Sequence, residues 1–366
     1  MAYDQMTEQT THAVTTDVLL SSRRLGALTR DQLQAALDGF GLGRLIAAEP
    51  VASGNWGQNC FLTSAEGEFV LRGAPFYEWQ LLEEQHFARL LHERTRAPVP
   101  WPYFVEQSSE LFGWPYAVMA RLPGEQLGGL VNRGALAPGD RLYLARLMGD
   151  TLAEVQELVW PVAGKYDPST GGIRATAAFN PSAESLKTYA LTPGIDAPGY
   201  VREFLARARR IAPERTTTTD EEWVEGIITR AADALQEPFT PRCVLPDYQE
   251  NNAAAAQDAD GAWQLSGVFD LMGASFGDGE KAVCRQLRGY LGQDPTLAVS
   301  YARAYFQRRA PRPGVCERLA LYLLADALTI WEWAHRAQRV WWEPSLTFRE
   351  WSGGDDRLTQ VLAQVL

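Results

Sequence analysis

The chain has very little lysine, histidine and cysteine. Its 34 basic residues include only three lysines, Lys165, Lys187 and Lys281, and there are 4 histidines and 4 cysteines among 366 residues. The cysteines form no CxxC pair and have no histidine at ligand spacing, which argues against a zinc site and against a disulfide framework. The histidines have no partner motif and are best explained as structural residues. Any cation required before residue 160 must therefore be an arginine.

The chain also lacks a signal-like opening and a long uncharged apolar run. The most apolar late stretch, LALYLLADALTIWEWA, contains Asp326 and Glu332, so it does not have the pattern of a membrane span. We therefore expect a cytoplasmic protein with no membrane partner. The net charge of -11 disfavours a nucleic-acid partner, whose phosphates it would repel, and is compatible with a cationic small molecule or with solubility alone.

The length predicts more than one domain, because a single hydrophobic core usually stops growing below this size. Residues 1–28 are polar and threonine-rich, and we expect them to form a flexible arm. Residues 29–124 begin with a helix capped by Thr29, and their strand-like segments and second periodic helix predict a sheet with one helix packed on it. Residues 125–366 are predicted to be mainly helical, with a long Gly- and Pro-rich loop over 164–199.

A short polar break, LPDYQENN, places Asp247 five residues before Asn252, and Asp270 ends the apolar stretch WQLSGVFD. Phosphoryl transfer from ATP needs a carboxylate at the attacking hydroxyl and oxygen ligands for magnesium. The spacing matches the catalytic loop of kinases, so Asp247 is the catalytic candidate, and Asn252 and Asp270 are the candidate Mg²⁺ ligands. On its own, the same spacing also fits two turn residues that bond to their own backbone.

The segment SGNWG lies between two strand-like stretches and is the candidate phosphate loop. Ser53, Gly54 and Gly57 could turn tightly there and offer backbone N–H groups to a phosphate. A plain hairpin tip has the same composition, so this alternative stays open.

Further nucleotide-binding candidates follow in the chain. Arg72, in the third strand, is the candidate phosphate-pairing cation, and Glu84 in the next helix is its candidate partner. Glu83 is a rival for that helix position, and an ordinary solvated ion pair is the simpler alternative. The segment YAVMARLPGE predicts a linker strand, in which backbone groups near Met119 and Arg121 are candidates for binding an adenine edge.

In this order the motifs resemble the aminoglycoside phosphotransferase and choline kinase superfamily, from about residue 29 to the end. The resemblance is carried by GNWGQNCFLTSAEGEFVLR, LLEEQHFARLLHERTRAPVPWPY, VMARLPGEQL, LMGDTLAEVQEL, LPDYQENN and GVFDLMGASFGD. It implies an α+β, protein-kinase-like bilobal fold, with an antiparallel β-sheet N-lobe that carries one helix and a mainly helical C-lobe. It also implies that ATP binds between the lobes and that its γ-phosphate passes to a small hydroxylated molecule, such as an aminoglycoside-like or other cationic acceptor.

The catalytic loop departs from the family pattern HGDxHxxN. The His-Gly pair is Leu245-Pro246 here, and the histidine two residues after the aspartate is Gln249. These changes motivate a second hypothesis, a catalytically impaired, nucleotide-binding pseudokinase of the same fold. A protein kinase is disfavoured, because the chain lacks His-Arg-Asp, Asp-Phe-Gly and Ala-Pro-Glu.

Aromatic and acidic residues gather near the C-terminus, in TIWEWAHRAQRVWWEPSLTFREW. Their helical spacing favours core packing, but tryptophan faces with carboxylates also suit a cationic or sugar-like acceptor. The resemblance places the acceptor pocket among the C-terminal helices, so these residues are unranked candidates. The sequence leaves a homodimer open.

Overall fold

The structure is a computed structural model that describes residues 17–51, 57–177, 179, 190–192, 194–353 and 356–366. The chain separates into two compact units. The first contains residues 1–75 and 104–121, and the second contains residues 76–103 and 122–366. The predicted domain boundaries remain a prediction; the units group the chain differently, since residues 76–103 belong to the second.

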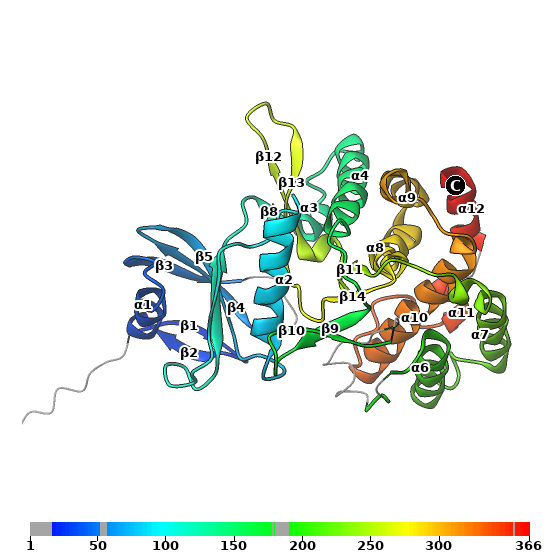
Figure 1. Ribbon diagram of the computed structural model, residues 1–366, viewed down its shortest axis with the longest axis horizontal. Helices are drawn as coiled ribbons and strands as arrows, with labels where there is room; N and C mark the ends of the chain where they lie inside the picture. The colour runs from blue at the N-terminus through cyan, green and yellow to red at the C-terminus, as the bar shows by residue number, and fades with distance from the viewer. Residues whose placement is uncertain (1–16, 52–56, 178, 180–189, 193, 354–355) are drawn as a thin grey trace, which may run out of the picture. The chain divides into compact units, whose positions relative to one another are not determined.

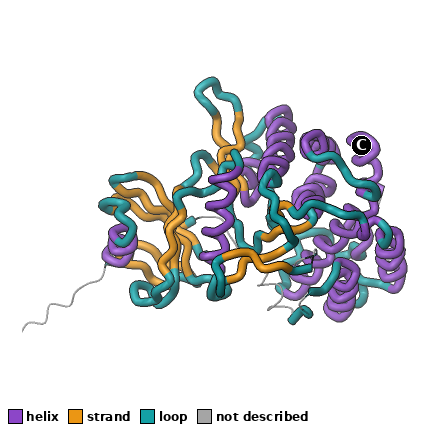
Figure 2. The backbone as a smooth tube through the Cα atoms, in the orientation of Figure 1, coloured by secondary structure: helices purple, strands orange, loops and turns teal. Residues whose placement is uncertain are grey.

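The first unit is built on a five-stranded sheet (Figures 1 and 2). Its strand order is β3-β4-β5-β7-β6, and the pairs β3 with β4, β4 with β5 and β5 with β7 are antiparallel. The strands are β3 Leu45–Pro50, β4 Asn59–Ser64, β5 Gly67–Gly73, β6 Tyr103–Glu106 and β7 Tyr116–Ala120. A tight turn in the segment SAEGE joins β4 and β5, where Ser64 pairs with Gly67.

One helix, α1 (Arg30–Asp38), packs beside this sheet. Thr29 caps it as predicted, since its side chain accepts a hydrogen bond from the backbone of Gln32, and the Gln32 side chain returns one to the backbone of Thr29. Leu33 and Leu37 are fully buried in a cluster with the sheet residue Leu71. Burial of this apolar stripe against the alternating inner face of the strands stabilises the unit.

Part of the predicted N-terminal arm is strand. β1 (Val18–Ser22) pairs antiparallel with β2 (Gly26–Thr29), and residues 1–16 lie outside the described residues. Leu25 and Leu28 are buried in the core cluster of the first unit. This burial explains why the second half of the segment is ordered structure and not an extension of the arm.

The second unit is mainly helical (Figure 2). In it, α4 packs on α9, and α10 packs on α6, α7 and α8. The helices of this unit are α2 Gln80–Arg94, α3 Leu127–Asn132, α4 Pro138–Val155, α6 Ala197–Ile211, α7 Thr218–Ala231, α8 Gly279–Gln293, α9 Pro295–Arg308, α10 Val315–Arg336, α11 Phe348–Ser352 and α12 Asp356–Val365. Across the residues that the structure describes, no helix is long and apolar enough to cross a bilayer.

Two small sheets complete the second unit, with strand orders β13-β12-β8 and β10-β9-β14-β11. Their strands are β8 Glu125–Gln126, β9 Gly164–Asp167, β10 Gly172–Ala175, β11 Arg242–Val244, β12 Ala253–Gln257, β13 Trp263–Val268 and β14 Ser275–Gly277. The β9-β10 hairpin lies inside the predicted 164–199 loop, so the start of that segment is regular structure. Most of residues 178–189 and residue 193 lie outside the described residues.

Candidate active site

The loop that carries Asp247 follows β11 and ends in a single 3-10 turn (Glu250–Asn252) that leads into β12. Buried contacts hold the part of the loop that follows Asp247. The hydroxyl of Tyr248 donates to the carbonyl of Met148 on α4 at 2.7 Å, and the backbone N–H of Glu250 donates to the side chain of Gln286 on α8 at 2.7 Å. The loop is therefore fixed to two helices of the same unit.

The Glu250 side chain adds a third anchor. Its carboxylate accepts a hydrogen bond from the hydroxyl of Tyr290 on α8 at 2.9 Å. Burial raises the pKa of Glu250, while the Tyr290 hydrogen bond acts in the opposite direction. A buried, bonded carboxyl at this place holds the turn that positions Asn252.

The carboxylate of Asp247 accepts three side-chain hydrogen bonds. Oδ1 accepts from Nε2 of Gln249 at 2.7 Å and from Nε of Arg285 on α8 at 2.8 Å. Oδ2 accepts from Nδ2 of Asn252 at 2.8 Å. A carboxylate has about four lone-pair positions, so the described residues leave one position, on Oδ2. The Asp247 side chain is 38% exposed, and this position can accept a proton from a ligand hydroxyl.

The backbone brings the two predicted metal ligands together. The backbone N–H of Phe269 donates to the carbonyl of Asn252 at 3.0 Å, so Asp270 follows directly after a residue paired with Asn252. Nδ2 of Asn252 is bound to Asp247, which leaves Oδ1 as its acceptor oxygen. The structure thus gathers Asp247, Asn252 and Asp270, which the sequence separates by up to 23 positions.

Asp270 has a left-handed backbone, with φ of 60°. Such a conformation is uncommon for a residue with a side chain and concentrates at functional sites. The segment after it is held by Glu83 of α2, whose carboxylate accepts from the backbone N–H of Gly273 at 3.0 Å and from the hydroxyl of Tyr77. The rival helix position identified in the sequence therefore supports the chain just after the candidate metal ligand.

Burial is the main cause that raises the pKa of Glu83 to about 7. The nearby charge of Glu84 acts in the same direction, whereas the Tyr77 and Gly273 hydrogen bonds and the charge of Lys165 lower it. Burial in turn lowers the pKa of Lys165 to about 8, with Glu83 opposing that shift. Glu83 is thus close to its ionisation point at neutral pH.

Arg285 connects Asp247 to a charge network in the helical core. Its Nη1 donates to Oδ1 of Asp326 on α10 at 2.9 Å, and Arg288 donates to the other carboxylate oxygen of Asp326. Burial alone would lower the pKa of Arg285, but the carboxylates of Asp326 and Asp247 outweigh it and raise that pKa. The cation beside Asp247 is therefore permanent and rigidly placed.

Glu84, in the second unit, accepts hydrogen bonds from Gln80 at 2.8 Å and from the hydroxyl of Tyr103 at 3.0 Å. In the first unit, Arg72 is buried in β5 opposite Ala117 of β7. Burial lowers the pKa of Arg24, and the nearby positive charge of Arg72 lowers it further.

The remaining nucleotide-binding candidates lie in the first unit. Gly57 has φ of 59°, which favours glycine, and its carbonyl accepts from Ser22 at 3.1 Å. Ser53 and Gly54 lie outside the described residues. Met119 is buried in β7, paired with Val70 of β5.

Arg121 follows β7, and its backbone N–H donates to the carbonyl of Glu68 at 3.0 Å. That N–H is therefore already engaged within the sheet. The Arg121 guanidinium lies over the ring of Phe61, 3.9 Å from its centroid.

The C-terminal aromatic residues pack mainly on one another. Trp331 is fully buried, stacks on Trp342 at 5.2 Å between ring centroids and donates to Thr216. The carboxylates beside these rings have local partners: Glu332 pairs with Arg336, Glu343 accepts from Ser345, and Glu350 caps α11 through Thr347. These contacts favour the packing interpretation over a cationic pocket.

Arg285, Asp326 and the support by Glu83 were missed in the sequence. Arg285 is 38 positions from Asp247, on a helix whose pattern shows only an apolar stripe. The sequence partly indicated a role for Gln249 in the loop, because it stands at the position where the family has a histidine. In the described ranges, no group of three or more His, Cys, Asp or Glu side chains could hold a metal, so a Mg²⁺ ion would need ligands from the nucleotide and water.

Comparison with known proteins identifies the family of the chain. Residues 47–315 match the phosphotransferase enzyme family. A homoserine kinase from Methylobacillus glycogenes is 30% identical over 128 residues, which are 34% of this chain and 40% of that protein. The chain thus spans about two fifths of the length of the curated relatives it matches.

Two solved structures show the fold. A protein assigned as an aminoglycoside phosphotransferase from Ralstonia eutropha JMP134 has a TM-score of 0.54 and 15% identity, covering 92% of this chain and 97% of that one. A microcompartment-associated aminopropanol kinase has a TM-score of 0.52 and 12% identity, covering 91% and 95%. The predicted α+β, protein-kinase-like fold is confirmed. The chain belongs to the phosphotransferase enzyme family.

Proposed function

We propose that the protein is an ATP- and Mg²⁺-dependent O-phosphotransferase that acts on a small hydroxylated molecule. The observation that supports this most is the carboxylate of Asp247, held by three donors with one acceptor position left on Oδ2. A small-molecule hydroxyl that donates to this oxygen would be oriented for attack on a phosphoryl group, and Oδ2 would then take its proton.

The Arg285 ion pair at 2.8 Å suits an orienting role for Asp247. The ion pair fixes the orientation of the carboxylate beside the position where the acceptor hydroxyl would lie. Phosphoryl transfer through a loose transition state needs positioning more than early deprotonation. The geometry is therefore compatible with a late proton transfer to Oδ2.

Asn252 and Asp270 are the residues that would hold Mg²⁺. One amide oxygen and one carboxylate fit its preference for oxygen ligands, with the remaining positions filled by phosphates and water. When bound, the ion would neutralise the charge on the phosphates. In the first unit, Gly57, Arg72 and the backbone near Met119 are the proposed nucleotide contacts, with Ser53 and Gly54 proposed from sequence alone.

The acceptor class is a small alcohol, and the homoserine kinase relative makes hydroxyl-bearing amino acids and amino alcohols the first candidates. The packing of Trp331 and the local partners of the nearby carboxylates give no support for a polycationic acceptor at that cluster. Aminoglycosides stay in the test panel because of the family.

The test is nucleotide turnover with purified protein against homoserine, choline, aminopropanol and aminoglycosides, with ATP and GTP compared. Asp247→Asn should lower turnover by roughly 10² to 10⁴ while leaving the nucleotide Kd unchanged. Asp260→Asn, in the exposed turn between β12 and β13, is the matched control and should keep full activity.

The pseudokinase alternative rests on Leu245-Pro246 in place of His-Gly. It predicts nucleotide binding without transfer to any acceptor in the panel, and no effect of Asp247→Asn. Acceptor-dependent ADP release that disappears in this variant would exclude it. The hydrogen bond from Gln249 to Asp247 favours the active enzyme, because this side chain supports the carboxylate directly.

A further inference from the structure

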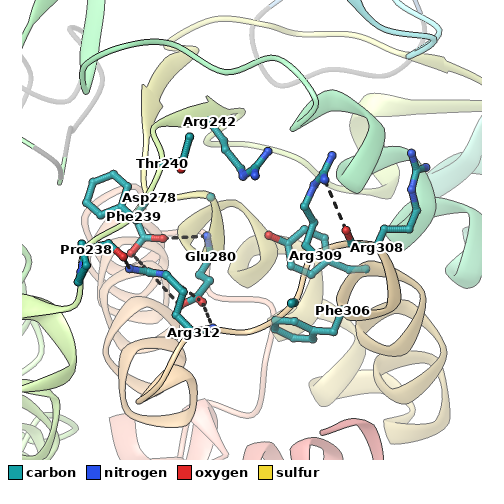
Figure 3. Close-up of a pocket in the computed structure, with 13 residues that line it drawn as sticks. Pro238, Phe239, Thr240, Arg242, Asp278, Glu280, Phe306, Arg308, Arg309 and Arg312 are labelled. Carbon is teal, nitrogen blue, oxygen red and sulfur yellow. Dashed lines mark hydrogen bonds and ion pairs between the residues drawn. The ribbon is translucent and has the colours of Figure 1, made fainter.

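The second unit contains a cavity of about 340 Å³ that the proposed reaction does not use. It is lined by residues 238–240 and Arg242 of β11, by the start of α8 at residues 278–280, and by the end of α9 with the following turn, residues 305–312. Figure 3 shows Arg242 and Arg309 on one side of it, and Arg312 beside Asp278 and Glu280 on the other. Its volume falls within the range of small-molecule sites.

Arginine dominates the charged lining. Arg312 is neutralised, since it pairs with Asp278 at 2.6 Å and with Glu280 at 3.1 Å. Glu280 is also bound by Arg318, which is buried behind it. The two carboxylates of the cavity are therefore already balanced by two guanidinium groups and do not neutralise the opposite wall.

Arg242 is the cation without a matching carboxylate. Its Nη1 donates to the backbone carbonyl of Gln156 at 2.7 Å, and in the described ranges no acidic side chain forms an ion pair with it. Burial and the adjacent charge of Arg309 lower the pKa of Arg242, and the carboxylate of Glu157 offsets only part of this. Burial is the larger cause of this shift, and the contribution of Arg309 shows that the two guanidinium groups lie close enough to repel each other.

Arg309 adds a second unsatisfied group. Its Nη2 binds the carbonyl of Ala153 and the carboxylate of Glu157, both at 2.6 Å. Its Nε is buried and has no hydrogen-bond partner among the described residues. A buried donor left without a partner is unfavourable, so Arg309 keeps unused hydrogen-bonding capacity beside the cavity that it lines.

We propose that this cavity binds a phosphate-bearing small molecule whose oxygens bridge Arg242 and Arg309. Guanidinium forks match phosphate oxygens in geometry and charge. The rings of Phe239 and Phe306 line the same cavity and provide apolar surface for the body of the ligand. The cavity is a binding site, and no bond is made or broken there.

The site is connected to Asp247 by two elements. β11 starts at Arg242 and leads to Asp247 five residues later, and α8 starts at the cavity with its cap Asp278 and carries Arg285 seven residues on. From the helix rise, the path along α8 is about 10 Å long. An anion bound at the cavity is thus separate from the acceptor, yet linked to the position of Asp247.

The test is a calorimetric titration of the full chain with inorganic phosphate, in the presence of saturating ADP so that the nucleotide site is filled. The wild type should bind phosphate, and Arg242→Gln and Arg309→Gln should each weaken the affinity at least tenfold. Arg210→Gln, at the exposed end of α6, removes the same charge elsewhere and should leave the affinity unchanged.

Absence of phosphate binding by the ADP-saturated wild type, or equal affinity in the wild type and both cavity variants, would overturn the proposal. Arg242→Lys keeps the charge, so it should keep most of the binding and shows whether a loss in Arg242→Gln comes from charge or from misfolding. Neither measurement requires phosphoryl transfer, so this proposal and the proposed reaction succeed or fail separately.

Discussion

Replacing Glu83 with glutamine should change how stability depends on pH. Glu83 is 2% exposed, and its carboxylate holds the backbone N–H of Gly273. Its pKa is about 7 in the folded protein, against an ordinary value of 4.5. Between these two values the folded state binds more protons at this site than the unfolded state, so the free energy of unfolding falls as pH rises through that window.

The size of this effect follows from the two pKa values. Their difference corresponds to about 3 kcal/mol, because each tenfold change in a proton equilibrium is about 1.4 kcal/mol. The loss begins above pH 4.5 and is complete above pH 7. Glutamine has no proton to lose and can still accept from Gly273, so Glu83→Gln should escape the loss and gain stability relative to the wild type from pH 5 to 8.

Urea denaturation followed by tryptophan fluorescence, repeated at pH 5, 6, 7 and 8, measures this directly. Glu93→Gln, on the exposed face of the same helix, is the control and should show no such trend against the wild type. A pH-independent change in the free energy of unfolding caused by the glutamine does not affect the result, because only the slope of that free energy against pH is compared. A constant difference between wild type and Glu83→Gln across this range would refute the reasoning.

The remaining predictions concern the site and its support. Arg285→Met should lower kcat about 10- to 100-fold with an unchanged nucleotide Kd. The reason is the loss of one charge-assisted hydrogen bond to Asp247, worth about 1.5 to 3 kcal/mol. Steady-state kinetics with an unchanged kcat would contradict this. Glu280→Gln should lower the free energy of unfolding by about 3 to 5 kcal/mol. The side chain of Arg318 is only 1% exposed and would lose its buried charged partner. A denaturation midpoint equal to that of the wild type would rule this out. Chelation of Mg²⁺ by EDTA should abolish turnover, and added Mg²⁺ should restore it; metal-independent turnover would remove Asn252 and Asp270 from the proposed role.

Local spacing in the sequence could indicate which candidate site residues lie near one another, while their roles stay predictions. Asp247 and Asn252 are five residues apart and joined by one turn, so their spacing makes the 2.8 Å contact between their side chains possible. Asp270 could be placed because it lies two residues after β13, which pairs with β12, the strand that follows Asn252. The contact of Arg285 with Asp247 could not be predicted, because it depends on how α8 packs, and no local sequence pattern indicates that packing.

The missed strands have a similar explanation. β1 and β2 have only five and four residues, too few for an alternating pattern to stand out from a polar segment. Their order comes from Leu25 and Leu28, which are buried by residues distant in the chain. The β9-β10 hairpin likewise depends on pairing of β9 with β14, a strand more than 100 residues later, and not on its own composition.

The substituted catalytic loop shows how the site can tolerate its departures from the family. Leu245 is buried, Tyr248 is bonded to α4, and Gln249 donates to Asp247, so the loop is held by contacts that need neither the family's His-Gly pair nor its second histidine. The position of Asp247 is then set by α4 and α8, which also form the core of the second unit. Mutations that loosen α8 should therefore lower stability and turnover together, whereas changes at residues 245 and 246 that keep the apolar contacts should affect both only slightly.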